Sequence, residues 1–470
     1  MTGLVFEAGE GTVTRTITGR IEADAPDWCY LPIEIPPGVA ELAVRYDYDT
    51  PTPQAGLPGN ACDIGIFGPA GHELGNARGF RGWSGGARRS FAISAADATP
   101  GYLPGPIEPG TWQLLLGPYT VAPQGLTYQV EVSITFGTRQ PTRPANPAPT
   151  TAPARARGRS EYRGDCHLHT VHSDGQRTQA ELVQAARAAG LDFVTSTEHN
   201  TPSGSLRWGE VATDDLLIIN GEEVTTRAGH WPAWNLPPGH WIDWRYRDGE
   251  FARFAKQVRG LGGLVVAAHP FGPCLGCSWT FDYDEVDVVE VWNGAWTLDD
   301  EAAVTCWDGL LRAGRWVPAV GDSDSHTDAD PVGRPHNVVR AEDLTAEHLM
   351  AGLRAGHNWL AESADVRVSL RVTDGTAGAG IGETLAVDSS GTPVAVEVDV
   401  AGAPGCVVRF HTQLGPRHQQ AVPASGRTRV SWQTMPRYTD WVRIEVRRPE
   451  PTQTTVDTMV ALTNPVFISW

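Results

Sequence analysis

The stretch Cys166-His167-Leu168-His169-Thr170-Val171-His172-Ser173-Asp174-Gly175 decides how the rest of the chain is interpreted. In an extended strand, residues i and i+2 point to the same side, so His167 and His169 would present two imidazoles next to each other. Two adjacent imidazoles can form half of a metal site. A His-x-His pattern is weak evidence by itself, because isolated histidines are usually core or surface residues.

More residues of ligand type follow the segments that are predicted to be strands. They are Glu198-His199, Glu222-Glu223, His230, His269 and Asp322-Ser323-Asp324-Ser325-His326. They come where apolar runs of β type end, such as Phe193 to Thr197 and Leu264 to Ala268. Because ligand residues and strand ends coincide repeatedly, the sequence predicts a site for several metal ions.

Helices are predicted between these strands. One begins at Thr178-Gln179-Ala180-Glu181, a capping-box pattern, and Gly190 is placed to end it. Further helices are predicted at 251–259, at 300–313 and from about residue 345. Strands that alternate with helices imply parallel β structure, and ligands at the carboxyl ends of strands are what a (β/α) barrel requires. Residues 160–363 are therefore predicted to form an α/β barrel.

The regions on either side show a period of two. Alternating apolar residues at 42–48 and 128–136, and again at 366–372 and 394–400, predict strands without a competing helical period. We expect a β-sandwich of jelly-roll type at 1–137 and a second, smaller β-sandwich at 364–470. Residues 138–159 are rich in Pro, Ala and Arg, and this composition predicts an extended linker.

Length and charge restrict the classes of function. A chain of 470 residues is expected to form about three domains. A formal net charge of -18 argues against a general nucleic-acid-binding protein. No apolar run is long enough to span a bilayer, and residues 1–20 do not resemble a signal peptide. We therefore expect a cytoplasmic protein with a small-molecule substrate, no membrane or nucleic-acid partner, and an open possibility of a homo-oligomer.

Seven cysteines are scattered over the chain and do not suggest a disulfide framework. The one close pair is Cys274-Leu275-Gly276-Cys277. It could be a metal-binding or redox pair, or a loop that happens to contain two thiols. Because no second such pair lies nearby, the interpretation as a loop with two thiols is favoured.

Taken together, the motifs resemble those of PHP (polymerase and histidinol phosphatase) metallohydrolases. The resemblance covers roughly 160–363. Features that resemble the CehA/McbA branch extend further, to the end of the chain. The PHP resemblance is carried by His167-x-His169, Ser173-Asp174-Gly175, Glu198-His199, Gly221-Glu222-Glu223, His269-Pro270 and Gly321-Asp322-Ser323-Asp324-Ser325-His326. The resemblance to the branch is carried by Glu223-Val224-Thr225-Thr226 with Gly229-His230, Val289-Glu290-Val291-Trp292-Asn293-Gly294 and Ala461-Leu462-Thr463-Asn464-Pro465.

The resemblance implies a distorted (β/α)7 barrel with two or three divalent metal ions, usually zinc, manganese or iron. The first ion would be held by His167, His169, Glu223 and Asp324. Glu223 would bridge to a second ion, which His230 and His269 complete. A third site would use His199 and His326; the usual histidine just after the first motif is missing, and Asp174 or His172 could replace it.

The expected reaction is hydrolysis, with a hydroxide that bridges two metal ions as the nucleophile. No Ser or Cys nucleophile is required. Asp324 is a candidate proton carrier, as is a nearby histidine such as His326. Glu223 would hold the ions together, and Glu198 stands where the family commonly has Asp, which makes it a candidate supporting carboxylate.

A phosphoester is slightly favoured as the substrate over a carbamate, ester or amide. Candidate substrate contacts are Arg227 and Arg334, which could clamp a phosphate, together with Trp292 and Asn293. Tryptophans crowd this part of the chain and could wall a pocket for an apolar group, or could pack the barrel against its neighbours. A non-catalytic binding protein is a third, less favoured possibility.

Overall fold

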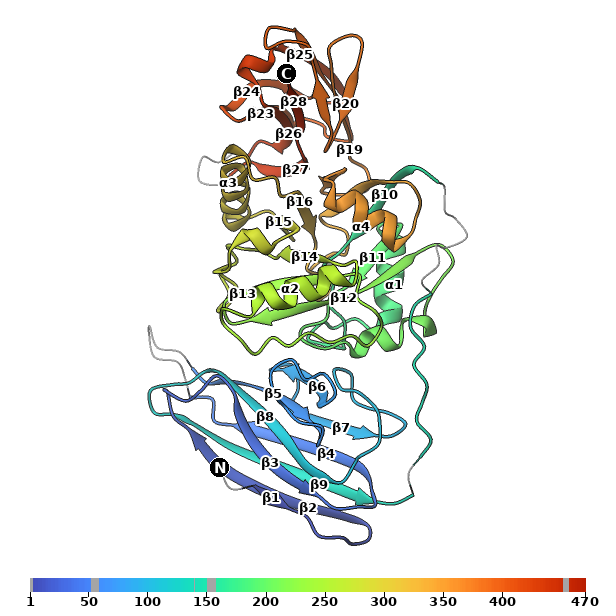
Figure 1. Cartoon of the computed structure of the whole chain (residues 1–470), viewed down its shortest axis with the longest axis vertical. Helices are drawn as coiled ribbons and strands as arrows, with labels where there is room; N and C mark the ends of the chain where they lie inside the picture. Colours follow the sequence, from blue (N-terminus) through green and yellow to red (C-terminus); the bar gives the residue numbers. More distant parts are fainter. Residues whose placement is uncertain (1–2, 52–58, 139, 150–157, 451–455) are drawn as a thin grey trace.

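The computed structural model describes residues 3–51, 59–138, 140–149, 158–450 and 456–470. Along its long axis the molecule has an N-terminal group of sheets, a central α/β region and a C-terminal group of sheets (Figure 1). The mixed α/β class was predicted correctly: strands dominate, and among the described residues only those of the central region form α-helices.

Two sheets form the N-terminal part and share one hydrophobic core, which includes Leu42, Val44 and Val130. Alternate residues of β4 face this core, as the period of two predicted. The first sheet has the order β1 (Leu4–Val5), β3 (Cys29–Ile35), β8 (Gly110–Thr120), β5 (Ala61–Phe67), β6 (Phe80–Gly85). The second has the order β2 (Thr12–Ile21), β9 (Leu126–Phe136), β4 (Val39–Tyr48), β7 (Ser90–Ser94).

The central strands belong to a 15-stranded sheet that continues into the C-terminal part. Strands β10, β11 and β12 are parallel to one another, as are β14, β15 and β16. In sheet order the central strands are β16 (Ala319–Asp322), β15 (Val288–Asn293), β14 (Leu264–Ala267), β13 (Gly229–Trp234), β12 (Leu217–Thr226), β11 (Phe193–Ser196), β10 (Ser160–Asp165), β17 (His336–Ala341) and β18 (Asn358–Ala361).

The predicted (β/α)7 barrel is not found, because the sheet is not closed. The pattern suggested a short strand and then the helix at 251–259, but β12 runs on to Thr226 and turns at Arg227 and Ala228 into an additional antiparallel strand, β13, before that helix. Strands β17 and β18 are also antiparallel to their neighbours. The two-residue turn leaves no room for a helix, so the strict alternation of strand and helix fails at this point.

Asparagine side chains bridge the gap where a closed barrel would have paired strands. The amide of Asn337 on β17 both accepts from Gly321 N (3.3 Å) and donates to Gly321 O (3.0 Å) of β16. Asn464 makes the same pair of bonds with Ala319, at 2.8 and 3.0 Å. These amides satisfy backbone groups of the edge strand β16 that would otherwise be buried without partners.

Four α-helices cover the central strands. The capping box predicted at Thr178 is present: its hydroxyl accepts from Glu181 N, and the Glu181 carboxylate accepts from Thr178 N. Gly190, with φ +75°, follows the helix where the chain turns. The helices are α1 (Gln179–Ala188), α2 (Phe251–Gly260), α3 (Leu298–Arg312) and α4 (Ala346–Arg354). Short 3₁₀ turns are η1 (Ser203–Leu206), η2 (Trp208–Glu210), η3 (Tyr283–Glu285) and η4 (Pro436–Tyr438).

The C-terminal part has two groups of strands around one core that includes Val396, Val408 and Ile444. One group continues the central sheet, because β27 pairs with β18. It contains β27 (Thr458–Thr463), β26 (Trp441–Arg448), β23 (Val407–Thr412), β24 (Gly415–Ala421), β28 (Val466–Ser469) and β21 (Thr384–Ala386). The other has the order β20 (Gly378–Gly380), β19 (Arg367–Thr373), β22 (Val394–Ala401), β25 (Thr428–Thr434).

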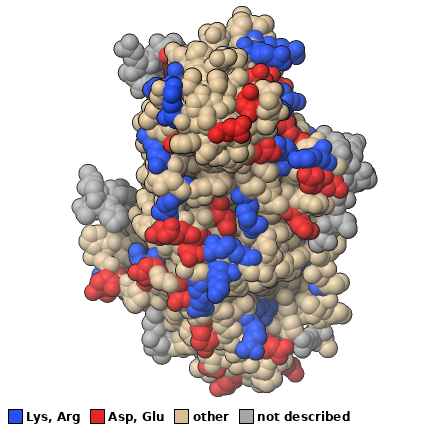
Figure 2. Space-filling model, turned by 45° about the horizontal axis from the view of Figure 1, so that its top comes forward, with Lys and Arg blue, Asp and Glu red and all other residues tan. Residues whose placement is uncertain are grey.

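Two predictions concern features outside these sheets. Much of the predicted linker, residues 139 and 150–157, lies outside the described residues, and the domain boundaries stay predictions. Among the described residues, no helix combines the length and the apolar character needed to cross a membrane. On the face shown in Figure 2, basic and acidic side chains are interspersed.

Candidate metal centre

Two buried imidazoles follow β10 and point in the same direction, as predicted for His167 and His169. His167 Nε2 lies 3.3 Å from Glu223 Oε2 and 3.4 Å from Asp324 Oδ1. His169 Nε2 lies 3.4 Å from the same Glu223 oxygen and 3.0 Å from the same Asp324 oxygen. Four side chains that are far apart in the sequence therefore converge on one point.

The Glu223 carboxylate on β12 faces imidazoles with both of its oxygens. Oε1 lies 3.2 Å from His230 Nδ1 and 3.3 Å from His269 Nε2. Oε2 lies 2.8 Å from His199 Nδ1. The β12–β13 hairpin creates this geometry, since His230 pairs with Thr225 in the register. A carboxylate in this position can bridge two metal ions.

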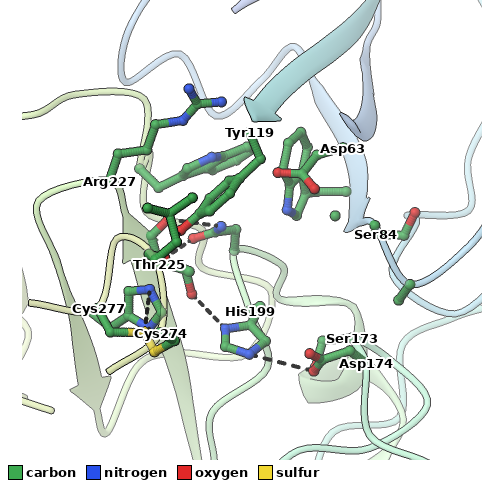
Figure 3. A pocket seen from close by; sticks show the side chains of 18 of the residues that line it. Asp63, Ser84, Tyr119, Ser173, Asp174, His199, Thr225, Arg227, Cys274 and Cys277 are labelled. Atoms are coloured by element: carbon green, nitrogen blue, oxygen red, sulfur yellow. Dashed lines mark hydrogen bonds and ion pairs between the residues drawn. A yellow bond between two sulfur atoms is a disulfide. The ribbon is translucent and has the colours of Figure 1, made fainter. Parts of the chain in front are cut away.

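A third group of donors lies beside His169, closer to the protein surface. Asp174 Oδ1 is 3.5 Å from His199 Nε2 and 3.3 Å from His326 Nε2 (Figure 3 draws the contact with His199). His172, the alternative to Asp174, turns away and contacts Ser203 Oγ through Nδ1 at 2.9 Å. One ligand atom from each of the following residues lies within 4.8 Å of the others: His169, Asp174, His199 and His326.

The buried donor atoms fit a metal ion better than they fit one another. Four of them make no hydrogen bond of good geometry within the described part of the chain, although Glu223 Oε2 lies close to His199 Nδ1: His167 Nε2, His169 Nε2, Glu223 Oε2 and Asp324 Oδ1. A buried polar atom left without a partner costs about 1–3 kcal/mol. Ligand atoms about 2.0–2.2 Å from a tetrahedral metal ion lie roughly 3–3.5 Å apart, which matches the contacts of 3.0–3.4 Å described above. Nitrogen and carboxylate donors suit zinc, manganese or iron.

Electrostatics keep the two central carboxylates ionised. Burial alone would raise the pKa of Glu223, but the neighbouring His199 and His167 hold it well below its usual value. Burial likewise opposes ionisation of Asp324, and His167 and His169 lower its pKa well below the usual value. The pKa of His169 falls to about 3, because it is buried and lies near His326 and His199. Against the effect of burial, the nearby carboxylates raise the pKa of His167 well above its usual value and that of His199 to about 10, so these two rings must lose a proton when they bind a metal ion.

The backbone is strained at two of the predicted ligands. His269 has φ +24° and Asp324 has φ +48°, which are conformations that residues with a Cβ rarely adopt. Both residues follow strands, β14 and β16, and the unusual conformation turns their side chains toward Glu223 and His169. Such strain persists when the surroundings enforce it, and it clusters at functional sites.

The sequence reasoning did not single out Glu290 on β15, which supports the cluster from behind. Its Oε1 lies 3.0 Å from His167 Nδ1, and its Oε2 accepts from His269 N at 2.8 Å. Asn293 Nδ2 donates to Glu290 Oε2 at 3.0 Å and to Asp324 Oδ2 at 3.2 Å. A carboxylate on the far nitrogen of a ligand histidine orients the ring and increases its basicity. The sequence feature that could have revealed Glu290 is its position as a single acidic residue inside the apolar run 288–292.

Glu198, a predicted catalytic residue, supports the histidine loop instead of facing the donors. Its carboxylate accepts from Thr170 N (3.1 Å), from the Thr170 hydroxyl (2.6 Å) and from the Ser173 hydroxyl (2.6 Å). Burial raises the pKa of Glu198, although these hydrogen bonds oppose the rise. These contacts fit the predicted supporting role and hold the loop that carries Asp174.

The donors open onto a pocket of about 450 Å³ between the central region and the N-terminal sheets. Aromatic side chains form much of its wall (Figure 3 labels Tyr119). The N-terminal part contributes to this wall, and no local sequence pattern shows which of its surfaces docks. The aromatic residues of the wall are Trp28, Trp83, Tyr119 and Trp244.

One carboxylate in this wall, Asp63 on β5, belongs to the N-terminal part (Figure 3). Burial raises its pKa to about 7, against the lowering effect of Arg227 and His199. At neutral pH this side chain is therefore close to its midpoint of ionisation. It is the one acidic residue that the N-terminal sheets add to the described pocket lining.

Of the predicted substrate contacts, only Arg227 lines this pocket. Its guanidinium donates to Asp27 Oδ1 at 2.9 Å and lies over the Trp28 and Tyr119 rings. Arg334 is exposed and lies outside the pocket lining. Trp292 is buried in the core, with its Nε1 donating to Gly294 O. Asn293 also lies outside the pocket lining and donates a hydrogen bond to the predicted ligand Asp324.

The preferred interpretation of Cys274 and Cys277, as two unpaired thiols in a loop, is wrong because the two residues form a disulfide. Both line the pocket, and Figure 3 shows the bond between their sulfur atoms. Cys277 is buried and Cys274 is exposed. The other described cysteines are free: Cys29, Cys62, Cys166, Cys306 and Cys406.

Comparisons with known proteins agree with the PHP motifs. No protein-family model matches the chain. An uncharacterised protein of Methanocaldococcus jannaschii is 30% identical over 117 residues, which is 23% of this chain and 45% of that protein. The error-prone DNA polymerase of Mycobacterium tuberculosis is 30% identical over 151 residues, which is 31% of this chain and 13% of the polymerase. The chain thus spans less than half the length of either relative.

Among solved structures, a two-domain protein of Bacteroides vulgatus, described as containing a predicted PHP-like metal-dependent phosphoesterase, is similar. It is 15% identical, with a TM-score of 0.38, over 69% of this chain and all of that one. At this score the two folds agree only in part.

The resemblance to PHP proteins is confirmed, since error-prone DNA polymerases carry a PHP domain. The CehA/McbA branch stays a prediction. Together with this resemblance, the donor set supports a site for divalent metal ions.

Proposed function

We propose that this protein is a hydrolase with two or three divalent metal ions that cleaves a small phosphoester with an apolar group. The observation that carries the proposal is the set of four facing, unpartnered donor atoms on His167, His169, Glu223 and Asp324 beside the pocket. Metal ions bound there would lower the pKa of a coordinated water and stabilise the negative charge that develops on the substrate.

The charge of the donor set favours an anionic substrate. Three carboxylates contribute to the donor groups, namely Asp174, Glu223 and Asp324; the imidazoles are neutral when they bind metal, and the Cys277 sulfur carries no charge while it is in the disulfide. Two ions would face Glu223, Asp324 and a hydroxide, and three ions would face all three carboxylates and a hydroxide, so one or two positive charges would remain. A phosphoester would balance the excess without a free arginine, which matters because Arg227 is already paired with Asp27.

The chain's own residues would orient the metal ligands, bind the substrate and carry protons. Glu290 and Asn293 hold ligand side chains in place. The aromatic wall would bind the apolar part of the substrate and exclude water. Asp324 and His326 border the pocket and are positioned to carry a proton to or from the reacting group.

A second candidate substrate is an aryl carbamate or ester. The observation that favours it is the wall of Trp28, Trp83, Tyr119 and Trp244, together with the pairing of Arg227. A neutral aromatic substrate would fit such a wall without a cationic side chain.

Hydrolysis assays on metal-analysed protein test the proposal. The substrates are bis-p-nitrophenyl phosphate, p-nitrophenyl phosphate and 1-naphthyl N-methylcarbamate. His169→Ala and Glu223→Ala remove ligands, and His348→Ala on α4 is the matched control outside the cluster. We expect phosphoester turnover that both ligand variants reduce at least about 100-fold, because losing a ligand should cost more than losing a residue that only supports one.

Other outcomes would change the proposed substrate class or reject the proposed function. Turnover of the carbamate alone would select the second candidate. Bound metal with no turnover of any substrate would leave the metal site and reject both substrate classes. Protein that binds no metal, or variants as active as His348→Ala, would reject the metal-dependent hydrolase itself.

A further inference from the structure

A thiol-bearing residue lies inside the candidate metal centre, next to the proposed second ion. Cys277 is 2% exposed, and its Sγ lies 3.9 Å from both ring nitrogens of His230. One ligand atom from each of His230, His269 and Cys277 lies within 4.8 Å of the others. His230 and His269 also face Glu223 Oε1, so Cys277 lies beside the two histidines that would complete the second site.

The partner of this sulfur is the exposed Cys274, three residues earlier. Both cysteines border the pocket, in the loop that follows β14. The loop is anchored at two places: Tyr119 Oη donates to Leu275 O, and Trp279 N donates to Pro270 O at 3.0 Å. Because these anchors do not involve the sulfur atoms, the loop is held in place beside His230 independently of the disulfide.

We propose that Cys277 is a metal ligand when the disulfide is reduced, so that the Cys274–Cys277 pair controls the coordination of the second ion. This inference rests on the proposed function, because it assumes a metal ion at His230, His269 and Glu223. Thiolate, imidazole and carboxylate together are a donor set that zinc binds in a tetrahedral arrangement. A disulfide sulfur carries no such charge, since the thiolate is the form that ligates metals.

The chemical step balances with a dithiol as the reductant. The S–S bond between Cys274 and Cys277 breaks and accepts two electrons and two protons, while the dithiol gives up two electrons and two protons and becomes a disulfide. The Cys277 thiol then loses its proton as it binds the ion, and the Cys274 thiol stays free. The exposure of Cys274 gives the attacking thiolate access to the bond.

Two serine variants separate a ligand from a simple covalent link in the loop. Both Cys274→Ser and Cys277→Ser abolish the disulfide, but only Cys274→Ser leaves a thiol beside His230. If the disulfide serves only to hold the loop, the two variants should behave alike. If Cys277 is a ligand, they should differ in the metal complex they form.

The test uses the full chain loaded with Co²⁺, with and without prior reduction by dithiothreitol and desalting. We expect a thiolate-to-cobalt charge-transfer band in the near ultraviolet for reduced wild type, and for Cys274→Ser in either condition. Oxidised wild type and Cys277→Ser should lack the band. We also expect Cys274→Ser to bind Zn²⁺ at least about tenfold more tightly than Cys277→Ser, because the thiolate adds a ligand.

Elemental analysis of the same samples separates the two proposals. Cobalt bound without the band in reduced wild type and Cys274→Ser would overturn the role of Cys277 and leave the metal-dependent hydrolase intact. A band that persists in Cys277→Ser would also overturn it. Protein that binds no cobalt in any state would reject the metal site on which both proposals rest.

Discussion

The candidate metal centre and the arginine cluster between α3 and β26 are both buried and charged, yet their side chains are satisfied in different ways. In the arginine cluster, Arg443 Nε donates to Asp308 Oδ1 (2.9 Å) and Arg443 Nη1 donates to Glu445 Oε1 (2.7 Å). Arg447 Nε donates to the other Glu445 oxygen at 2.7 Å, and Arg447 also binds Glu301. Each of these two arginines is therefore paired with at least one carboxylate.

The metal centre differs because its donors and acceptors face one another without pairing. His167 Nε2, His169 Nε2, Glu223 Oε2 and Asp324 Oδ1 are buried and unpartnered within the described part of the chain. Glu445 keeps an ionised carboxylate because Arg443, His411 and Arg447 lower its pKa against the effect of burial. The comparison teaches that burial and charge alone do not mark a site; unpartnered ligand atoms that converge on one point do.

The largest effect should come from breaking the paired cluster. Arg443→Met leaves Asp308 and Glu445 buried without their shared cation, and we expect a loss of about 3–5 kcal/mol in the free energy of unfolding. Chemical denaturation with and without a chelator measures it, and the loss should be the same in both. Arg429→Met, which removes an exposed ion pair with Asp399, is the control and should change stability far less. A chelator-dependent loss would show that the two clusters are not independent.

Removing the bridging carboxylate should abolish the stabilisation of the fold by metal. At an ion concentration about 100 times the Kd, bound metal stabilises the fold by about 2.7 kcal/mol. Wild type should lose this on chelation, whereas Glu223→Gln should unfold at the same temperature with and without chelator. The exposed Glu347→Gln on α4 should respond as wild type does. If the Glu223→Gln variant still gains stability from metal, then Glu223 does not bridge the metal ions.

A smaller effect is expected from Glu290, which contacts a ligand and would not touch metal. Glu290→Gln weakens the orientation of His167 and should lower metal affinity by about 10–100-fold. Competition with a chromogenic chelator measures the Kd, with the exposed Glu397→Gln on β22 as control. An unchanged Kd would mean that the hydrogen bond between Glu290 and His167 does not tune the site.

The last effect is the dependence of stability on pH. Burial raises the pKa of Asp63 from 3.8 to about 7 in the folded chain. The contribution of this group to stability is therefore complete below about pH 4 and is lost as pH rises to about 7. Asp63→Asn, which cannot ionise, should gain thermal stability over wild type at pH 8 but much less at pH 5. The exposed Asp24→Asn serves as control; an equal difference at both pH values would contradict the raised pKa.

Local patterns predicted much of the central region. The capping box at Thr178 and Glu181 needs only residues three apart, and the helix forms there as expected. The strand–helix alternation failed at Arg227, where two residues close a hairpin that no periodicity distinguishes from the start of a helix. Glu290 was missed for a related reason: an acidic residue in an apolar strand has a role only once its neighbours across the sheet are known.

The sequence by itself determined the donor types and their places at strand ends, because strand periodicity is a local property of the chain. It determined the capped helix and the alternating strands for the same reason. Only the tertiary structure decided that Asp174 and not His172 joins His199 and His326, that Asn337 and Asn464 bridge an open sheet, and that N-terminal side chains wall the pocket. These features depend on contacts between residues far apart in the chain, which no local period encodes.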